Sequence, residues 1–203
     1  VHTSGCLEPR IQHAQAFGCH SPLLPGALDL EPSCRIKAFL KNEKNTPHPF
    51  SGIPGFNLAR GRPACQSSVY LHEIIGSANK AVDGDCDGNY TQGSCTHTNG
   101  EANPWWYVDL GTSYAIAAVI VYNRADCCSE RLRGAEVRVG NSVIDGGKSN
   151  ALCGTIENTT DSASTLHCNW LRGRYVTIRI PRQSVYLMLC EVEVYGLVSE
   201  NQC

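Results

Sequence analysis

Short apolar segments separated by polar, glycine-rich stretches dominate the chain from about residue 56 onward. Five have the length and the branched or aromatic content of β-strands: Trp106 to Leu110, Ala115 to Tyr122, Ala135 to Val139, Tyr175 to Ile180 and Val185 to Tyr195. In RYVTIRI, residues 174–180, Tyr175, Thr177 and Arg179 fall on one face and branched apolar residues on the other, as in a half-buried strand. Because helical patterns are scarce, we predict an all-β fold, an antiparallel sandwich.

Residues 1–55 do not share this pattern. They hold three cysteines (Cys6, Cys19 and Cys34), several prolines, and no sustained periodicity beyond a short possible helix around residues 34–42. We therefore expect three regions: an irregular disulfide-linked N-terminal arm over residues 1–55, a domain over residues 56–198, and a C-terminal tail over residues 199–203 that ends in a disulfide-forming cysteine.

The 12 cysteines include no CxxC pair and no zinc-finger spacing, so disulfides are expected. Disulfides indicate an oxidising compartment and hence a secreted, extracellular protein. Sequons at Asn89 and Asn158 agree with a secreted glycoprotein, although either Asn could stay unmodified. The formal net charge is −2 and Lys and Arg are scattered, so we expect no nucleic-acid partner. The longest apolar run, residues 115–122, is too short to span a bilayer, and the sequence from Val1 shows no signal-like apolar stretch, which predicts a soluble, processed chain without membrane insertion.

The stretch DGDCDGN, residues 83–89, resembles the first half of a helix-loop-helix calcium loop. The match fails at the twelfth position, where Ser94 replaces the bidentate Glu, and neither flank is helical in pattern. Calcium is still compatible with such a loop, since it accepts six to eight oxygens, and Glu191 could complete the shell. The alternative is a solvated Asp/Gly turn.

Two cysteines lie side by side in NRADCCSERLRG, residues 123–134. Adjacent cysteines usually bond to different distant partners, because their Cα atoms are closer than a disulfide prefers. Arg124, Asp126 and Arg131 flank them and could be ordinary solvated loop charges, as His97 could be an ordinary loop histidine. In the earlier stretch PWWYVDL the two adjacent tryptophans point to opposite faces, so at most one belongs to the core.

Taken together, these residues resemble the signature of the F-type lectins, or fucolectins. In this chain the signature is His97, then 26 residues, Arg124-Ala125-Asp126, then four residues and Arg131. The resemblance covers about residues 57–196, through NLARGRPACQSS, AVDGD, GSCTHT, ANPWWYVDL, NRADCCSERLRGAEVRVG, GRYVTIRI and LCEVEVYG. It implies an antiparallel β-sandwich jelly roll, related in fold to discoidin domains, that contains calcium and binds L-fucose.

The resemblance assigns roles to single residues. His97, Arg124 and Arg131 would donate hydrogen bonds to the oxygen of an axial sugar hydroxyl, and Asp126 would orient the arginines. Cys127 and Cys128 would close a vicinal disulfide that packs against an edge of the sugar, as a rigid apolar shelf. The fucose methyl group needs an apolar contact, for which Tyr90, with Leu71 and His72 on the same rim, is the candidate; plain packing is the alternative.

The same matching implies a structural Ca²⁺ and three disulfides. The calcium ligands would be backbone carbonyls of Lys80, Asp85 and Cys190 and side chains of Asp83, Ser94 and Glu191. The disulfides would be Cys127–Cys128, Cys95–Cys190 and Cys153–Cys168. Six cysteines remain with 15 possible pairings. Because pairing inside the arm would leave an odd thiol, we expect an arm cysteine to bond to Cys65, Cys86 or, first choice, Cys203, or to another subunit.

Two other classes of function compete with a lectin for fucosylated glycans. An enzyme would need a poised base or two carboxyl groups astride a bond, whereas the site offers Asp126 and Glu130 between arginines, so we predict no enzyme. A discoidin-like protein- or membrane-binding module is the stronger alternative, since fold does not decide function, but it would need exposed apolar or basic loops. Weak single-site affinity favours a homo-oligomer for a lectin.

Overall fold

Six β-strands and four short 3₁₀ turns make up the part of the chain described by this computed structural model, residues 56–198. The strands are β1 (Ala64–Gln66), β2 (Trp105–Tyr122), β3 (Ala135–Gly140), β4 (Ala151–Ile156), β5 (Ala163–Arg179) and β6 (Glu191–Val198). The turns are η1 (Ala78–Ala81), η2 (Tyr90–Gln92), η3 (Ser129–Leu132) and η4 (Ile144–Gly147). The predicted all-β class is confirmed.

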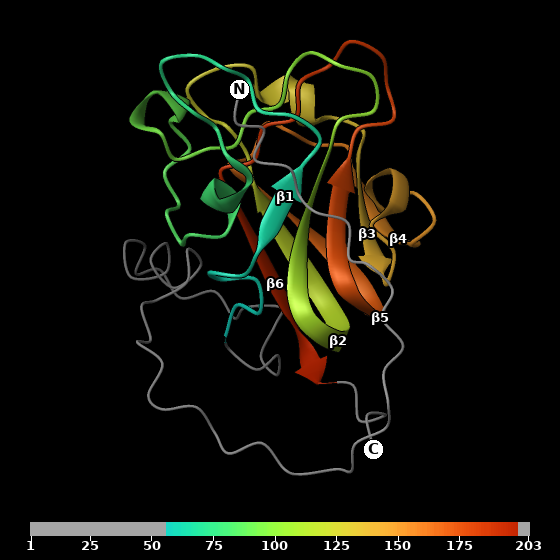
Figure 1. The fold of residues 1–203 in the computed structure, drawn as a ribbon. Helices are drawn as coiled ribbons and strands as arrows, with labels where there is room; N and C mark the ends of the chain where they lie inside the picture. The colour runs from blue at the N-terminus through green and yellow to red at the C-terminus, as the bar shows by residue number, and fades with distance from the viewer. Residues whose placement is uncertain (1–55, 199–203) are drawn as a thin grey trace. The chain divides into compact units, whose positions relative to one another are not determined.

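All strand pairs are antiparallel, in the order β1-β2-β5-β3-β4 with β6 also paired to β2. The two long strands, β2 and β5, pair over most of their length, with an irregularity between Asp109 and Tyr114, and both bend so that they belong to both layers of the sandwich (Figure 1). This continuous pairing is how a jelly roll turns its corners without leaving an open edge between the layers.

A bulge in β2 keeps apolar side chains pointing inward on both sides of the bend. Residues Trp106, Val108 and Leu110 are buried before it, and Val119 and Val121 after it, so the buried positions change from even to odd numbers. The strand register shifts between Ile116 and Ala118, and one extra residue reverses the face of every later side chain. As predicted, only one of the adjacent tryptophans lies in the core: Trp106 is fully buried, whereas Trp105 is half-buried and stacks on Tyr107.

The structure corrects several predicted strands. The first two predicted strands are one strand, β2, and β5 begins 12 residues earlier than expected, at Ala163 rather than Tyr175. β1 and β4 were not predicted. Residues 185–190 are not part of β6, because their amides bond to the neighbouring loop, as in Leu187 N to the Thr98 hydroxyl.

RYVTIRI was also wrongly expected to be half-buried. Both of its faces are covered, and Tyr175, Thr177 and Arg179 are all buried. The cover includes the η4 segment, where a Cβ added to Gly147 would lie 2.5 Å from the Thr177 methyl carbon, and an ion pair joins Arg179 to Glu136 at 3.5 Å. The alternation of residues therefore predicted the strand correctly, but it did not predict that another segment covers its second face.

The three disulfides implied by the family resemblance are present: Cys95–Cys190, Cys127–Cys128 and Cys153–Cys168. Cys65 and Cys86 are also disulfide-bonded. The predictions for the arm, its possible helix and the tail lie outside the described residues, as do Cys6, Cys19, Cys34 and Cys203. Within residues 56–198, no helix has the length and apolar character needed to cross a bilayer.

Candidate functional site

Loops from four parts of the chain meet at one end of the sandwich (Figure 1). Backbone hydrogen bonds fix their positions: Thr96 N donates to Leu189 O at 2.7 Å, and Ala125 N donates to Gly88 O at 2.8 Å. Gly88 is needed at this crossing, because a Cβ there would lie 2.8 Å from the Cβ of Ala125. His97, the NRADCC stretch and the segment before β6 are brought together in this way.

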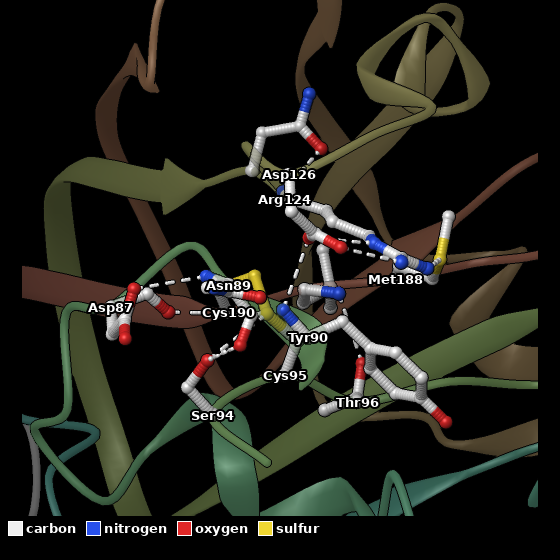
Figure 2. The surroundings of a disulfide bond; sticks show 12 residues. Asp87, Asn89, Tyr90, Ser94, Cys95, Thr96, Arg124, Asp126, Met188 and Cys190 are labelled. Carbon is white, nitrogen blue, oxygen red and sulfur yellow. Dashed lines mark hydrogen bonds and ion pairs between the residues drawn. A yellow bond between two sulfur atoms is a disulfide. The ribbon is translucent and has the colours of Figure 1, made fainter. Parts of the chain in front are cut away.

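Arg124 is held by a carboxylate, a sulfur atom and an aromatic ring. Its Nε and Nη2 donate to the two carboxylate oxygens of Asp126 at 2.9 and 2.7 Å, and Nη1 lies 3.5 Å from the Met188 sulfur (Figure 2). The guanidinium carbon sits 4.6 Å from the centre of the Tyr90 ring. This geometry leaves one hydrogen on each terminal nitrogen available to a ligand, on a group that can hardly turn.

Asp126 has a second bond that ties the two loops together. Its Oδ1 accepts a hydrogen bond from Tyr90 N at 3.1 Å. The hydrogen bonds from Arg124 hold the pKa of the Asp126 carboxyl below its ordinary value against the opposing effect of burial, so it is ionised at neutral pH. The prediction that Asp126 orients the arginines is correct for Arg124 only.

Arg131 is positioned by a ring instead of a carboxylate. Its guanidinium carbon lies 4.9 Å from the ring centre of Tyr186, and Arg131 forms no ion pair within residues 56–198. Gly100 gives the ring its space, since a Cβ there would be 2.9 Å from Tyr186 Cζ. Cation–π contact fixes the guanidinium plane while leaving its charge uncompensated.

His97 lies between the two tyrosines that carry the arginines. Its side chain is buried, with ring centroids 5.1 Å from Tyr90 and 5.4 Å from Tyr186, and a third ring, Tyr70, lies 4.8 Å away. The order in space is therefore arginine, tyrosine, histidine, tyrosine, arginine. We call Tyr90, His97 and Tyr186 the aromatic bracket.

The protonation of His97 follows from its surroundings. Nδ1 lies 2.7 Å from the Thr98 carbonyl oxygen, which can only accept, so Nδ1 carries the proton. Burial lowers the pKa of His97, the carbonyl bond opposes this, and the positive charges of Arg124 and Arg131 lower it further. The neutral ring leaves Nε2 as a hydrogen-bond acceptor, and no hydrogen bond to it occurs within residues 56–198. Sequence reasoning had treated His97 as a donor; the structure gives it the opposite role.

Cys127 and Cys128 form the vicinal disulfide, and both are half-buried beside Asp126. Cys128 has a left-handed backbone, with φ of 61°, which is unfavourable for a residue with a side chain. Its neighbours hold it there: Arg131 N donates to Cys128 O at 3.1 Å, and the Asn123 side chain donates to Ser129 O at 2.9 Å. Two sulfur atoms without hydrogen-bonding hydrogens thus form an apolar group that follows directly in the chain after Asp126, the carboxylate bound to Arg124.

The three residues predicted to form the apolar rim differ in their exposure to solvent. Tyr90 is buried and its hydroxyl donates to Ile74 O at 2.8 Å, while its ring carries Arg124. Leu71 is 84% exposed, and the exposed His72 stacks on Tyr70 with ring centroids 5.8 Å apart. Tyr90 is therefore a structural support of the site as well as a candidate contact, whereas Leu71 is free to meet a ligand.

The predicted calcium ligands surround a buried carboxylate, Glu191. It is fully buried, Oε2 accepts from Gly84 N at 3.3 Å, and Oε1 has no hydrogen-bond partner. Burial, with the nearby charges of Asp83 and Glu193, raises the pKa of Glu191 to about 9. The charge of Arg60 opposes this increase only in part, and a calcium ion is a group that fits a buried carboxylate with one oxygen unpaired within residues 56–198.

Among the other predicted calcium ligands, only Asp83 and Asp85 carry a carboxylate. Asp83 and Asp85 are exposed, and each accepts the amide two residues later, at 2.9 and 3.1 Å. Ser94 is buried, and its hydroxyl donates to Asn89 O at 2.9 Å. Lys80 lies in η1, and Cys190 is the disulfide partner of Cys95. Residues 56–198 contain no group of three His, Cys, Asp or Glu side chains suited to a metal, so any site here depends on carbonyl oxygens.

Sequence reasoning missed two residues of the site, Tyr70 and Tyr186. Both lie in irregular segments without periodicity, and Tyr186 falls inside an apolar run that was read as strand core. No local signal marks them, because their contacts with His97 are made by segments 27 and 89 positions away in the chain.

Comparison with known proteins places this geometry among carbohydrate-binding domains. A family model described as NedA-like, galactose-binding domain matches residues 80–178. Fucolectin-4 of Anguilla japonica is 43% identical over 172 residues, which cover 82% of this chain and 94% of that protein. The pentraxin fusion protein of Xenopus laevis is 40% identical over 64% of this chain, but the match covers only 31% of that protein.

Solved structures agree with the sequence relatives. The f-lectin (fucolectin) from striped bass serum, Morone saxatilis, superposes with a TM-score of 0.66 and 41% identity, covering 73% of this chain and 50% of that one. The lectin domain of lectinolysin complexed with Lewis B antigen gives a TM-score of 0.61 at 32% identity, covering 70% and 96%. Both matches confirm the predicted jelly-roll sandwich.

Proposed function

The chain belongs to the fucolectin family, and from that premise we propose that it is a lectin that binds L-fucose on glycans through His97, Arg124 and Arg131. The observation that carries the proposal is the aromatic bracket, which holds two guanidiniums on either side of a neutral, buried imidazole. Membership of a lectin family also agrees with the prediction that the protein is not an enzyme.

The hydrogen-bonding pattern suits an axial hydroxyl group. A hydroxyl offers two lone pairs and one proton, and the site supplies two charged donors and one acceptor, Nε2 of His97. Bonds from charged donors are about twice as strong as neutral ones, which favours Arg124 and Arg131 for the lone pairs. A hydroxyl in the ring plane could not reach all three groups from the same side, so the arrangement selects the stereochemistry of the sugar.

The vicinal disulfide contributes contact rather than charge. Its two half-buried cysteines directly follow Asp126, the partner of Arg124, and a sugar ring bound to the arginines would rest an edge on the sulfur atoms. Leu71 supplies an exposed apolar surface for a methyl group, with Tyr90 beneath the arginine. These contacts distinguish fucose, which carries a methyl group, from sugars that present a hydroxymethyl group there.

A structural Ca²⁺ is part of the proposal. Glu191 and Asp83 would hold it together with carbonyl and hydroxyl oxygens of residues 80, 85, 94 and 190, and the ion would neutralise the buried carboxylate. Such an ion braces the segment from residue 83 to 94, and this segment presents Tyr90 to both Asp126 and Arg124. We also infer secretion from the disulfides, and self-association from the low affinity that single sugar sites give.

The test compares a site variant with a matched surface variant. Arg124→Ala removes two donors and leaves the main hydrophobic core unchanged, so fucose binding measured by calorimetry should fall below detection while the thermal melt stays cooperative. Arg172→Ala, an exposed arginine in β5, should bind as the parent does. Retention on fucose-agarose with release by free fucose supports the lectin. Flow-through of the parent protein with calcium present would favour a discoidin-like protein- or membrane-binding module.

A further inference from the structure

Three arginines without carboxylate partners gather beside the proposed sugar site. Arg131, Arg133 and Arg182 form no ion pair within residues 56–198, and Arg133 and Arg182 are exposed. Sequence inspection did not reveal them as a group, because Arg182 is about 50 positions away from the others. We call these three residues the basic rim.

Arg182 is fixed in place by backbone atoms alone. Its Nη2 donates to the carbonyl oxygens of Arg131 at 3.1 Å and Arg133 at 2.5 Å. These bonds join the loop before β6 to the loop after η3, and they restrict a side chain that would otherwise be mobile. The remaining donors of this guanidinium, on Nε and Nη1, have no partner within the described residues, so they stay available to an anion without further ordering.

Within residues 56–198, no carboxylate forms an ion pair with the basic rim. Asp126 is engaged by Arg124, and Glu101 accepts bonds from the hydroxyls of Ser67 and Ser68, both at 2.6 Å. Glu130, the acid within the same loop, forms no ion pair in the described part of the chain. A cluster of positive charge thus stands on a chain whose formal net charge is −2.

We propose that the basic rim is a subsite for an acidic substituent, a sulfate ester or a sialic acid carboxylate, on the glycan that carries the fucose. This inference rests on the proposed function, since Arg131 belongs to both the sugar site and the basic rim. Guanidiniums match sulfate and carboxylate groups in shape and charge, and they bind them with stronger hydrogen bonds than neutral hydroxyls receive. The ligand class is therefore anionic fucosylated glycans rather than neutral ones.

The experiment measures the affinity of the intact protein for three glycans that differ in one group. They are a neutral fucosylated trisaccharide and the same trisaccharide carrying either a sulfate ester or N-acetylneuraminic acid on its galactose. At low salt we expect at least one acidic form to bind about fivefold more tightly than the neutral form, the gain expected for partly exposed ion pairs. The advantage should shrink as salt is raised, because exposed charges are screened.

Variants separate this subsite from the sugar site. Arg133→Gln and Arg182→Gln should each reduce the preference for the acidic glycan while leaving the affinity for the neutral one unchanged. Arg172 in β5 pairs with Ala115, about seven residues or roughly 20 Å from the loop end of β2 at Tyr122. Arg172→Gln removes the same charge there and should change neither the affinity for the neutral glycan nor the preference for the acidic one. If Arg182→Gln also lowers the affinity for the neutral glycan by loosening the loops, the result for Arg133→Gln decides whether the subsite exists.

The outcomes distinguish the two proposals. Equal affinity of the parent protein for all three glycans would overturn the subsite and leave the fucose proposal intact. So would a preference that both variants keep. No binding of the neutral glycan would defeat the fucose proposal and the subsite with it. A preference for only one acidic form identifies its source as sulfate or sialic acid.

Discussion

The two arginines of the site are held in different ways. Arg124 is locked by a bidentate carboxylate, whereas Arg131 rests on the ring of Tyr186 and has no carboxylate partner in the described part of the chain. Both stack on tyrosines that contact His97, so the aromatic support is shared and the charge compensation is not. The position of each arginine and the net charge around it are therefore set by different contacts. The Arg124 side is neutralised by Asp126, whereas the Arg131 side stays positive.

Removing the carboxylate should test the locked side most severely. Asp126→Asn loses the charge-assisted fork to Arg124, and because such bonds contribute about 1.5–3 kcal/mol, we expect fucose affinity to fall about tenfold or more. Calorimetry gives the change, and Glu130→Gln, which changes an exposed acid that forms no ion pair within residues 56–198, serves as the matched control. Equal affinities for Asp126→Asn and the parent would show that Arg124 does not need its carboxylate.

Removing the ring should test the other side less severely. Tyr186→Leu deletes the cation–π contact under Arg131, which contributes about 1 kcal/mol, so the affinity should fall about fivefold. Tyr186→Phe keeps the ring and should bind like the parent. If the phenylalanine variant loses as much affinity as the leucine variant, the hydroxyl rather than the ring positions Arg131.

Removing the proposed Ca²⁺ with a chelator should weaken the side of the site that contains Tyr90 and Arg124. A ligand that binds only the folded state stabilises it, so excess chelator should lower the melting temperature by a few °C and weaken fucose binding about twofold. Calcium should restore both values, and magnesium should not, because it needs a smaller, more regular oxygen shell. An unchanged melting temperature in chelator would remove calcium from the account of this loop.

The smallest effect near neutral pH should come from His97. Its folded-state pKa lies below the ordinary value, so the ring stays neutral and fucose affinity should be constant from about pH 8 to 6.5. Below that range the unfolded state takes up a proton before the folded state does, so His97 makes stability fall with decreasing pH, and binding falls once Nε2 is protonated. His167→Gln, which changes an exposed histidine of β5, should leave the profile unchanged. Affinity that rises on acidification would mean that His97 acts as a donor.

Local pattern was sufficient for the fold class and for the residues that the family resemblance carried. Alternation located β3 and parts of β2, β5 and β6, and the spacing of His97, Arg124 and Arg131 is a property of the linear sequence. The vicinal disulfide was implied by the family resemblance, since adjacency by itself favours separate distant partners for two neighbouring cysteines. Strand alternation and signature spacing are properties of residue order, so the linear sequence records them directly.

Only the tertiary structure decided what surrounds those residues. It placed Tyr70 and Tyr186 against His97, joined Arg182 to the loop of Arg131, and covered the second face of RYVTIRI. It also set the proton on Nδ1 of His97, through the carbonyl of Thr98, and thereby turned an expected donor into an acceptor. Such contacts depend on how the bulged strands return the loops to one end of the sandwich, and residue spacing does not record this when the partners are tens of positions apart.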